Sequence, residues 1–484
     1  MDRRAFMRMG ATASVVAAGG GVPVAGQAAA TEAPEVSGAA KDVTKSLAEY
    51  VVKARFEELP DRVRTEVGRS LLNWMGVTVG GSRHRTADIA ISAVQIFAGP
   101  QQASLFGRRE RLDIMNAALV NGISSHVLDF DDTDLKTAVH PSAPVLPALL
   151  AMAELKPMNG RDFVTAMVMG FEAECRIARA VQPAFGDIGW HATGAAGVFG
   201  AAVATGRILG LDEVRMCHAI GLAATQPVGI REMFGSMTKS FHPGRAAQNG
   251  MLAAFLADKG YTSSLQGIEA KRGWANLVST KHDLAIITEG FGDHYEIYRN
   301  TYKPYACGLV IHPVIDGCVQ LRNEYKLTAD QIERIDVDIH PIVMELTAKK
   351  NPKTGLEGKF SVFYVAALAI VAGKAGESQF TDQAVADPAV VSLQRRVQAN
   401  IDKSITEDQA RIRIRLKDGR VLERFVAHVI GSVENPMSDA ALAEKFSDLC
   451  AGILSDDKIH RLADLCHTPE KLADAGDIGR AAAA

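Results

Sequence analysis

The chain has 484 residues, of which 47% are hydrophobic and 23% are charged, and its formal net charge at pH 7 is −3. This is the composition of an ordinary globular protein, and the length is sufficient for two domains. The near-neutral charge excludes the basic face that binds nucleic acid and also excludes an acidic tail. We therefore expect no nucleic-acid partner.

The first 30 residues have the pattern of an export signal. Arg3 and Arg4 form a pair, and no charged residue occurs at positions 9–31. Small residues occupy the −3 and −1 positions before a cleavage site after Ala30. This resembles a twin-arginine signal, which would pass the folded protein to an export machinery and place it in the periplasm. A disordered Ala- and Gly-rich leader is the alternative. The stretch is too short and too rich in glycine to predict a stable membrane anchor.

A long helical region follows a polar, proline-containing linker at residues 31–45. Between about residues 46 and 285 the hydrophobic spacing is that of helices. One helix is predicted to begin at Pro60, and another to begin at Pro243 and to end at Gly260. Three glycines at three-residue spacing predict two closely packed helices, since no phosphate-binding motif occurs in a strand–turn–helix context.

After about residue 285 apolar and polar residues alternate, as they do in half-buried strands. One such run spans residues 333–339, and another spans residues 411–416. Asp418 and Gly419 follow the second run and predict the tight turn of a hairpin. An apolar run at residues 360–373 predicts a helix between the two.

These patterns predict a mainly α protein in which a smaller α+β lid domain is inserted into a large all-helical domain. The helical domain comprises residues 46–285 and 436–475, and the lid comprises residues 286–435. Residues 476–484 are expected to form a disordered tail. A cleft between two such domains is a common place for a small-molecule site.

Six cysteines are scattered along the chain, with no CxxC pair and no spacing typical of a zinc site. They predict six free thiols that are mostly buried. A disulfide remains an alternative, because separation in the sequence says nothing about proximity in space.

The most informative segment is 128–142, LDFDDTDLKTAVHPS, which places a histidine and several carboxylates in a mostly apolar context. Uncompensated charge is costly in such surroundings. If the preceding helix continues through the segment, His126, Asp129 and Thr133 share one helix face. A polar stripe of this kind suits a proton-transfer site. A satisfied core network or a helix-end cap is the alternative.

The other aspartates of this segment are expected to face solvent or to cap a helix. The segment fits neither a calcium-binding loop nor a DDxxD metal motif. We expect no metal, although a metal bound by Asp129, His140 and His191 is an alternative. The aspartates concerned are Asp131, Asp132 and Asp134.

Several motifs occur together in an order that resembles one known family. They are His126-x-x-Asp129-Phe-Asp-Asp-Thr133, His140-Pro-Ser, Gly189-Trp-His191-Ala-Thr-Gly194, Lys239-x-x-His242, Tyr302-Lys303-Pro and His312-Pro. From about residue 45 to residue 470 the chain resembles the MmgE/PrpD family. This family contains 2-methylcitrate dehydratases, cis-aconitate decarboxylases and an iminodisuccinate epimerase.

The resemblance implies a homodimer with a site between helical domain and lid, and no organic cofactor. It implies a lyase or isomerase that acts by acid–base chemistry next to a carboxylate of a small di- or tricarboxylate. Dehydration of the 2-methylcitrate type is our first expectation, and decarboxylation of the cis-aconitate type or epimerisation of the iminodisuccinate type are alternatives. From other classes, the alternatives are an inactive periplasmic polycarboxylate-binding protein and a metal-dependent hydrolase.

The motif matches assign catalytic positions to six residues: Asp129, Thr133, His140, His191, Lys239 and His312. His140 and His191 are expected to act as the acid–base pair, since imidazole titrates near neutrality. Asp129 is expected to orient one imidazole, and Thr133 to donate a hydrogen bond to the substrate.

Cationic side chains are expected to hold the carboxylates of the substrate. Lys239 and Lys303 are the first candidates, helped by the helix N-terminus just after Trp190. His242 and Arg245 are second candidates, and His312 is expected to reach the cleft from the lid. Each residue also has a structural reading: a lysine in a loop is often solvated, and a histidine before proline often satisfies loop backbone.

Overall fold

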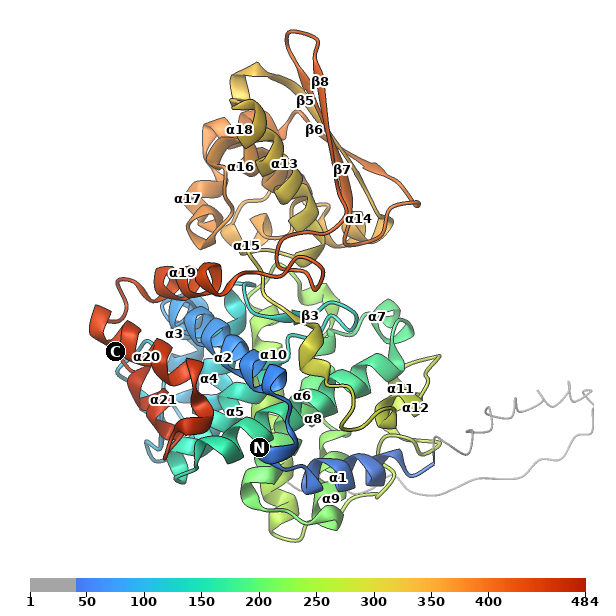
Figure 1. The fold of residues 1–484 in the computed structure, drawn as a ribbon, viewed down its shortest axis with the longest axis vertical. Coiled ribbons are helices and arrows are strands. Elements are labelled where there is room, and N and C mark those ends of the chain that lie inside the picture. The colour runs from blue at the N-terminus through green and yellow to red at the C-terminus, as the bar shows by residue number, and fades with distance from the viewer. Residues whose placement is uncertain (1–40) are drawn as a thin grey trace, which may run out of the picture. The chain divides into compact units, whose positions relative to one another are not determined.

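The computed structural model describes residues 41–484, which belong to one compact unit (Figure 1). The predicted signal and most of the predicted linker lie outside the described residues. The described chain is mainly helical, as the sequence predicts, with one small sheet inserted in the second half.

Twelve α-helices precede the inserted region. They are α1 (Val43–Lys53), α2 (Asp61–Gly81), α3 (Arg85–Val94), α4 (Ile114–Val127), α5 (Ser142–Leu155), α6 (Gly160–Val181), α7 (Ala184–Ile188), α8 (Ala192–Leu209), α9 (Glu213–Ala223), α10 (Thr238–Asp258), α11 (Trp274–Val278) and α12 (Ala285–Thr288). The short strands β1 (Ala103–Ser104), β2 (Arg111–Leu112), β3 (Thr133–Asp134) and β4 (Asn300–Thr301) form two separate two-stranded pairs.

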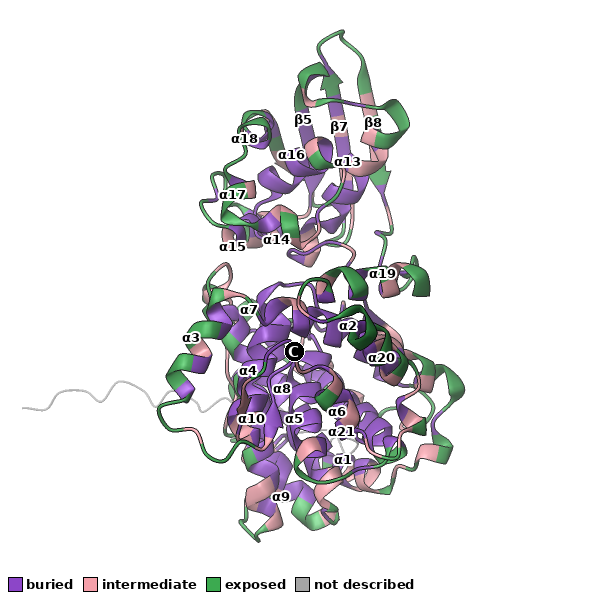
Figure 2. Cartoon of the chain, turned by 90° about the vertical axis from the view of Figure 1, so that its left-hand side faces the viewer, coloured by how far each residue is buried: buried purple, intermediate pink, exposed green. Residues whose placement is uncertain are grey.

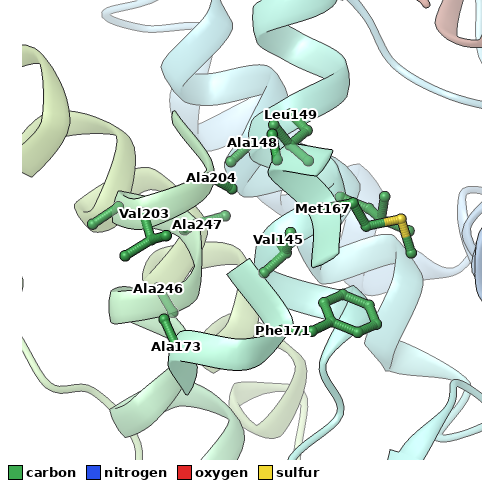
Figure 3. Packing of buried hydrophobic residues seen from close by; sticks show 14 of the residues in the cluster. Val145, Ala148, Leu149, Met167, Phe171, Ala173, Val203, Ala204, Ala246 and Ala247 are labelled. Atoms are coloured by element: carbon green, nitrogen blue, oxygen red, sulfur yellow. The ribbon is translucent and has the colours of Figure 1, made fainter. Parts of the chain in front are cut away.

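Helix α8 lies at the centre of this helical region, where it packs against α5, α6 and α10. It is long and apolar enough to cross a membrane, but it is 83% buried within the protein, which makes it a core helix (Figure 2). The predicted close packing is confirmed, because a Cβ atom on Gly197 would come within 2.5 Å of Pro144. Short side chains such as Ala204 and Ala246 fill the space between these helices (Figure 3).

Helix α10 begins five residues earlier than predicted, at Thr238 instead of Pro243. Proline lacks an N–H group and therefore breaks an internal helical hydrogen bond, which is why the sequence suggested a start there. In the structure Pro243 is buried in the second turn of the helix. This places Lys239 in the first turn of α10, where its side chain is buried.

The inserted region contains a four-stranded sheet and several helices. Its elements are α13 (His312–Tyr325), β5 (Ile332–Ile339), α14 (Pro341–Thr347), α15 (Gly355–Gly358), α16 (Val362–Ala372), α17 (Asp382–Val385), α18 (Pro388–Gln394), β6 (Val397–Ile401), β7 (Ala410–Leu416) and β8 (Val421–Val426). The strand order is β6-β5-β7-β8; β5 and β6 are parallel, and the other neighbours are antiparallel.

The predicted strands, hairpin and apolar helix of this region are confirmed. Strand β5 buries Ile335, Val337 and Ile339, and the β7–β8 turn contains Gly419 with a φ of 90°. A positive φ of this size is favourable for glycine. Helix α16 packs against α13 and α18 and is buried over most of its length (Figure 2).

The C-terminal part returns to helices. Helix α19 (Asp439–Cys450) packs against α2 and is capped by Ser438, whose side chain accepts a hydrogen bond from the Ala441 backbone N–H. It is followed by α20 (Asp456–His467) and α21 (Gly476–Ala481). The prediction of a disordered tail at residues 476–484 is wrong, because Ile478 is buried and α21 packs against α5. All six cysteines lie in the described residues as free, buried thiols, which confirms that prediction.

Candidate active site

The acidic segment does not continue the helix that precedes it. Helix α4 ends at Val127, and Asp129 has a φ of 52°, in the left-handed region that aspartate tolerates better than most residues. Thr133 then enters strand β3, which pairs with β4. The expected stripe on one helix face is therefore absent, and the same side chains are brought together by a turn.

Asp129 binds two lysine side chains. Its Oδ1 atom accepts hydrogen bonds from Lys239 Nζ at 2.8 Å and from Lys303 Nζ at 2.9 Å. Burial would raise the pKa of this carboxyl, but the two ammonium groups hold it well below its usual range. Asp129 was expected to orient an imidazole, and this expectation is wrong: the carboxylate fixes the two lysines.

Asp131 is the carboxylate that contacts the imidazoles. Its Oδ2 atom lies 2.7 Å from His126 Nδ1, and its Oδ1 atom lies 3.3 Å from His140 Nδ1. Asp131 and His126 are buried. The prediction that Asp131 faces solvent is therefore wrong. Burial opposes its charge, but the two histidines lower the pKa of Asp131 well below its usual range.

The two remaining aspartates of the segment are also buried, so their predicted solvent exposure is wrong as well. Asp132 accepts hydrogen bonds from Ser142 Oγ and Asn300 Nδ2, both at 2.6 Å, and burial raises its pKa to about 7. Asp134 accepts a hydrogen bond from the Lys136 backbone N–H at 2.9 Å, and burial raises its pKa to about 6. The turn at Asp129 directs this whole segment into the protein interior.

His191 stands immediately before α8 and belongs to a group of adjacent imidazoles. Its Nδ1 atom is 2.9 Å from His242 Nδ1, and its ring centroid is 5.5 Å from that of His126. Burial lowers the pKa of His140 and His191, and it lowers that of His242 to about 4. Because the ordinary pKa of histidine is about 6.5, imidazoles with a lowered pKa are neutral near pH 7.

A cavity of about 910 Å³ brings most of the predicted residues together. Its lining also includes Ala192, so the N-terminus of α8 faces the cavity as predicted. Both lysines that bind Asp129 contribute to the lining. The predicted site residues in the cavity wall are Asp129, Thr133, His140, His191, Lys239 and Lys303.

Three predicted site residues do not line this cavity. His242 lies behind His191, with which it shares a contact. Arg245 is exposed on α10 and donates a hydrogen bond to Gln248. His312 was expected to reach the cleft, which is wrong: it is fully buried, and its Nε2 atom lies 3.2 Å from the Cys307 carbonyl oxygen.

Sequence reasoning missed a set of buried residues that hold the site in shape. His126 Nε2 lies 2.9 Å from Lys239 Nζ, which links the histidines to the lysines. Lys359 Nζ donates to the Leu128 carbonyl oxygen at 2.6 Å, and Lys445 Nζ donates to the Phe130 carbonyl oxygen at 2.7 Å. Lys359 precedes the apolar helix α16 and Lys445 lies within α19, and this sequence context is the signal that could have indicated their burial.

The site offers two groups of potential metal ligands, but it fits an anion better. Nitrogens of His126, His140 and His191 lie within 4.8 Å of one another, as do ligand atoms of Asp129, Asp131 and His140. The ammonium group of Lys239 contacts members of both groups, at 2.9 Å and 2.8 Å. A divalent cation there would lie beside this ammonium group, whereas a carboxylate would be attracted to it.

This arrangement is suited to acid–base chemistry on an anion, because ammonium groups can hold carboxylates and imidazoles beside them can transfer a proton. Comparison with known proteins gives the family. The MmgE/PrpD N-terminal domain matches residues 45–287, and the MmgE/PrpD C-terminal domain matches residues 305–468. The chain belongs to the MmgE/PrpD family.

Named relatives of this family resemble the chain over nearly its whole length. A cis-aconitate decarboxylase from Aspergillus terreus is 25% identical over 472 residues, covering 90% of this chain and 95% of that protein. The cis-aconitate decarboxylase of Mus musculus is 27% identical over 461 residues, with coverage of 91% and 93%. A mitochondrial 2-methylcitrate dehydratase from Yarrowia lipolytica is 21% identical over 463 residues, with coverage of 87% and 86%. The chain is thus an enzyme of the MmgE/PrpD type, whose named relatives are lyases.

Proposed function

We propose that this enzyme is a cofactor-independent lyase that cleaves a bond at the carbon next to a carboxylate of a small di- or tricarboxylate. The observation that carries the proposal is the convergence of two lysines and two histidines, Lys239, Lys303, His140 and His191, on one cavity. Decarboxylation of a cis-aconitate-like substrate is the first reaction to test, because the relatives at 25–27% identity reported above carry that name. Dehydration, which the sequence put first, is the second candidate and has support from the 2-methylcitrate dehydratase relative.

Lys239 is the better placed of the two lysines to bind a substrate carboxylate. An ammonium group has three donors. Lys303 directs two of them to the backbone and side chain of Asp129 and the third to the Cys307 carbonyl oxygen, at 3.5 Å. Lys239 directs one to Asp129 and contacts His126, which leaves a donor for a ligand in the cavity. Asp129 thus holds both ammonium groups in place.

Substrate binding favours the protonated form of His140, and this form supplies the proton for the reaction. The pKa of His140 is lowered by burial, and Lys303 and Lys239 lower it further, whereas Asp131 raises it. A bound polycarboxylate adds negative charge beside this imidazole and favours its protonated form. In decarboxylation the C–C bond to one carboxylate breaks and its electron pair remains on the adjacent carbon. The protonated His140 can then deliver its proton to that carbon, while Asp131 stabilises the imidazolium.

The histidines separate this proposal from the rival of another class, a polycarboxylate-binding protein without turnover. Lysines and arginines alone would be sufficient to bind carboxylates, whereas a buried Asp131–His140 contact is suited to proton transfer. A metal-dependent hydrolase is disfavoured by the position of Lys239 among the potential ligands.

Proton NMR of the purified protein in deuterated water tests the proposal with cis-aconitate, citrate, isocitrate, 2-methylcitrate, malate and iminodisuccinate. Loss of a carboxylate with deuterium at the adjacent carbon identifies decarboxylation, and new alkene signals without loss of carbon dioxide identify dehydration. Deuterium exchange with loss of stereochemistry identifies epimerisation. If every substrate stays unchanged, and His140→Ala binds one of them as tightly as the wild type, the binding-protein alternative replaces the proposal.

A further inference from the structure

The cavity is much larger than a simple polycarboxylate requires. A tricarboxylate has about a dozen heavy atoms and occupies at most about 360 Å³, judged from the roughly 30 Å³ that a water molecule takes in the liquid. The cavity volume is about 910 Å³, at the upper end for sites that bind drug-sized ligands. Most of the space is therefore left over once the carboxylates reach Lys239.

The part of the cavity wall that continues outward from Lys239 is apolar. Two aromatic rings begin it: Phe234 and Phe360 have ring centroids 5.8 Å apart, and Lys239 Nζ lies 5.4 Å and 5.8 Å from them. The helical turn Leu309–Ile311 follows Gly308, whose N–H donates to the Lys359 carbonyl oxygen next to Phe360. We define the apolar wall by six lining residues: Phe234, Leu309, Val310, Ile342, Leu346 and Phe360.

The apolar wall is continuous because its elements contact one another. Helix α14, which carries Ile342 and Leu346, packs against the turn Leu309–Ile311 and against α16. Leu309, Val310, Ile342 and Leu346 are all half-buried. Apolar side chains that line a concave cavity without being fully buried are stabilised when a ligand covers them.

We propose that the preferred substrate is a di- or tricarboxylate with an alkyl chain of several carbons, longer than a methyl group, that lies along the apolar wall. This inference rests on the proposed function and specifies its substrate class. The carboxylates bind at Lys239, and the alkyl chain extends from there past Phe234 and Phe360 toward Ile342 and Leu346. Burying one methylene group strengthens binding roughly three- to fourfold, so affinity rises with chain length until the wall ends.

Calorimetric titration with tricarballylate and its hexyl derivative measures this preference without any reaction, since neither compound can be dehydrated or decarboxylated in the expected way. The hexyl compound is expected to bind on the order of 1000-fold more tightly if all six carbons lie along the wall. In Ile342→Ser this ratio falls about tenfold, whereas Leu277→Ser, at a leucine that is 74% exposed and does not line the cavity, retains the wild-type ratio. Thermal unfolding verifies that both variants are folded.

Turnover is then compared for citrate, 2-methylcitrate, 2-propylcitrate and 2-hexylcitrate and for the matching alkyl cis-aconitates. A kcat/KM that rises with chain length supports the proposal. Equal affinity for tricarballylate and its hexyl derivative overturns it and leaves the proposed lyase function intact. Conversely, absence of any turnover with a preserved affinity ratio overturns the lyase function and leaves the apolar subsite in place.

Discussion

Asp129, Asp131 and Asp132 are close neighbours in the sequence and have three different environments. Asp129 contacts two ammonium groups, Asp131 contacts two imidazoles, and Asp132 has only neutral hydrogen-bond partners. Their pKa values accordingly diverge: the first two are lowered, and the third is raised to about 7. The partner of each carboxylate, and not its sequence position, decides its charge.

Asp131→Asn is expected to lower kcat by about 10²–10⁴ with a much smaller effect on KM. Asp131 raises the pKa of His140, so its removal lowers that pKa further and weakens the protonated form. The limb of the pH–kcat profile that reports this histidine therefore shifts to lower pH. Steady-state kinetics between pH 5 and pH 9 measures the shift.

Asp457→Asn is the matched control for this prediction, because Asp457 is exposed on α20, and it should retain the wild-type profile. An unchanged kcat in Asp131→Asn would show that the Asp131–His140 contact has no part in proton transfer.

His242 makes the stability of the protein depend on pH in a defined direction. Its pKa is lowered by burial to about 4 in the folded state, against about 6.5 in an unfolded chain. Between these values the unfolded chain binds more protons, so this histidine destabilises the fold as the pH falls from about 6.5 to about 4.

His242→Gln removes this dependence and keeps a hydrogen-bonding side chain beside His191. When the pH is lowered from 7.5 to 4.5, we expect the free energy of unfolding of the variant to fall by about 2 kcal/mol less than that of the wild type, after allowance for partial solvent screening. Denaturant titrations at the two pH values measure the difference. Parallel pH dependence in the two proteins would contradict the prediction.

At the level of elements, the site depends on a close crossing of α4 and α10. A Cβ atom on Gly122 would come within 2.5 Å of the Gly244 Cα atom, and a Cβ atom on Gly244 would collide with the Leu119 carbonyl oxygen. These helices carry His126 and Lys239, whose side chains contact each other. The two glycines therefore set the distance between an imidazole and an ammonium group.

Gly244→Ala is expected to separate the two helices, to destabilise the fold by about 1–3 kcal/mol and to lower kcat/KM through displacement of Lys239. Gly376→Ala is the matched control, since a Cβ atom there meets nothing closer than 3.5 Å. Thermal unfolding and kinetics of both variants test the prediction. Wild-type activity in Gly244→Ala would show that the crossing tolerates a methyl group.

The elements that could be predicted from the sequence are those whose own pattern determines them. Strands β5 and β7, the turn at Gly419 and helix α16 follow from local periodicity and turn residues. The left-handed turn at Asp129 was missed because no glycine marks it.

The rest of the site depends on contacts between distant parts of the chain, which a single sequence does not report. Lys445 on α19 binds the carbonyl oxygens of Phe130 and Lys303, more than a hundred residues away in the sequence. The family motifs identified the lysines and histidines of the cavity wall, but not which carboxylate holds which of them.

At the scale of the whole molecule, one face carries exposed apolar side chains. Phe241 and Leu252 lie on the exposed side of α10, and Ile96 and Phe97 follow α3 with 85% and 70% exposure. A chain of hydrogen bonds links the two segments: Gln248 on α10 donates to Asn116, and Asp113 accepts from both Asn116 and the Gly99 backbone N–H, two residues after Phe97. Clustered exposed apolar side chains are typical of an interaction surface.

We propose that this face joins two copies of the chain in the homodimer that the family resemblance implies. Light scattering after size-exclusion chromatography is expected to give twice the chain mass for the wild type. The double variant Phe97→Asp with Phe241→Asp is expected to be a monomer, because dimerisation would bury the two unpaired carboxylates. Leu277→Asp, at an exposed leucine outside this face, should remain dimeric. A monomeric wild type would contradict the proposal.

The predicted export signal is consistent with the thiol chemistry of the folded protein. All six cysteines are free and buried. A chain with six thiols that folded in an oxidising compartment would risk disulfides that the fold does not contain, whereas folding in a reducing compartment before export avoids them. We propose on this ground that the chain is exported by a pathway for folded proteins.

We expect the processed protein in the periplasmic fraction of the native cell to begin at Thr31, as N-terminal sequencing would show. Replacing Arg3 and Arg4 by lysine should leave the full-length precursor in the cytoplasm, with its catalytic activity intact because the described fold begins after this segment. The same replacement at Arg83 and Arg85, which are exposed and lie outside the signal, should not change the compartment. Export of the lysine variant at the wild-type level would contradict a twin-arginine route.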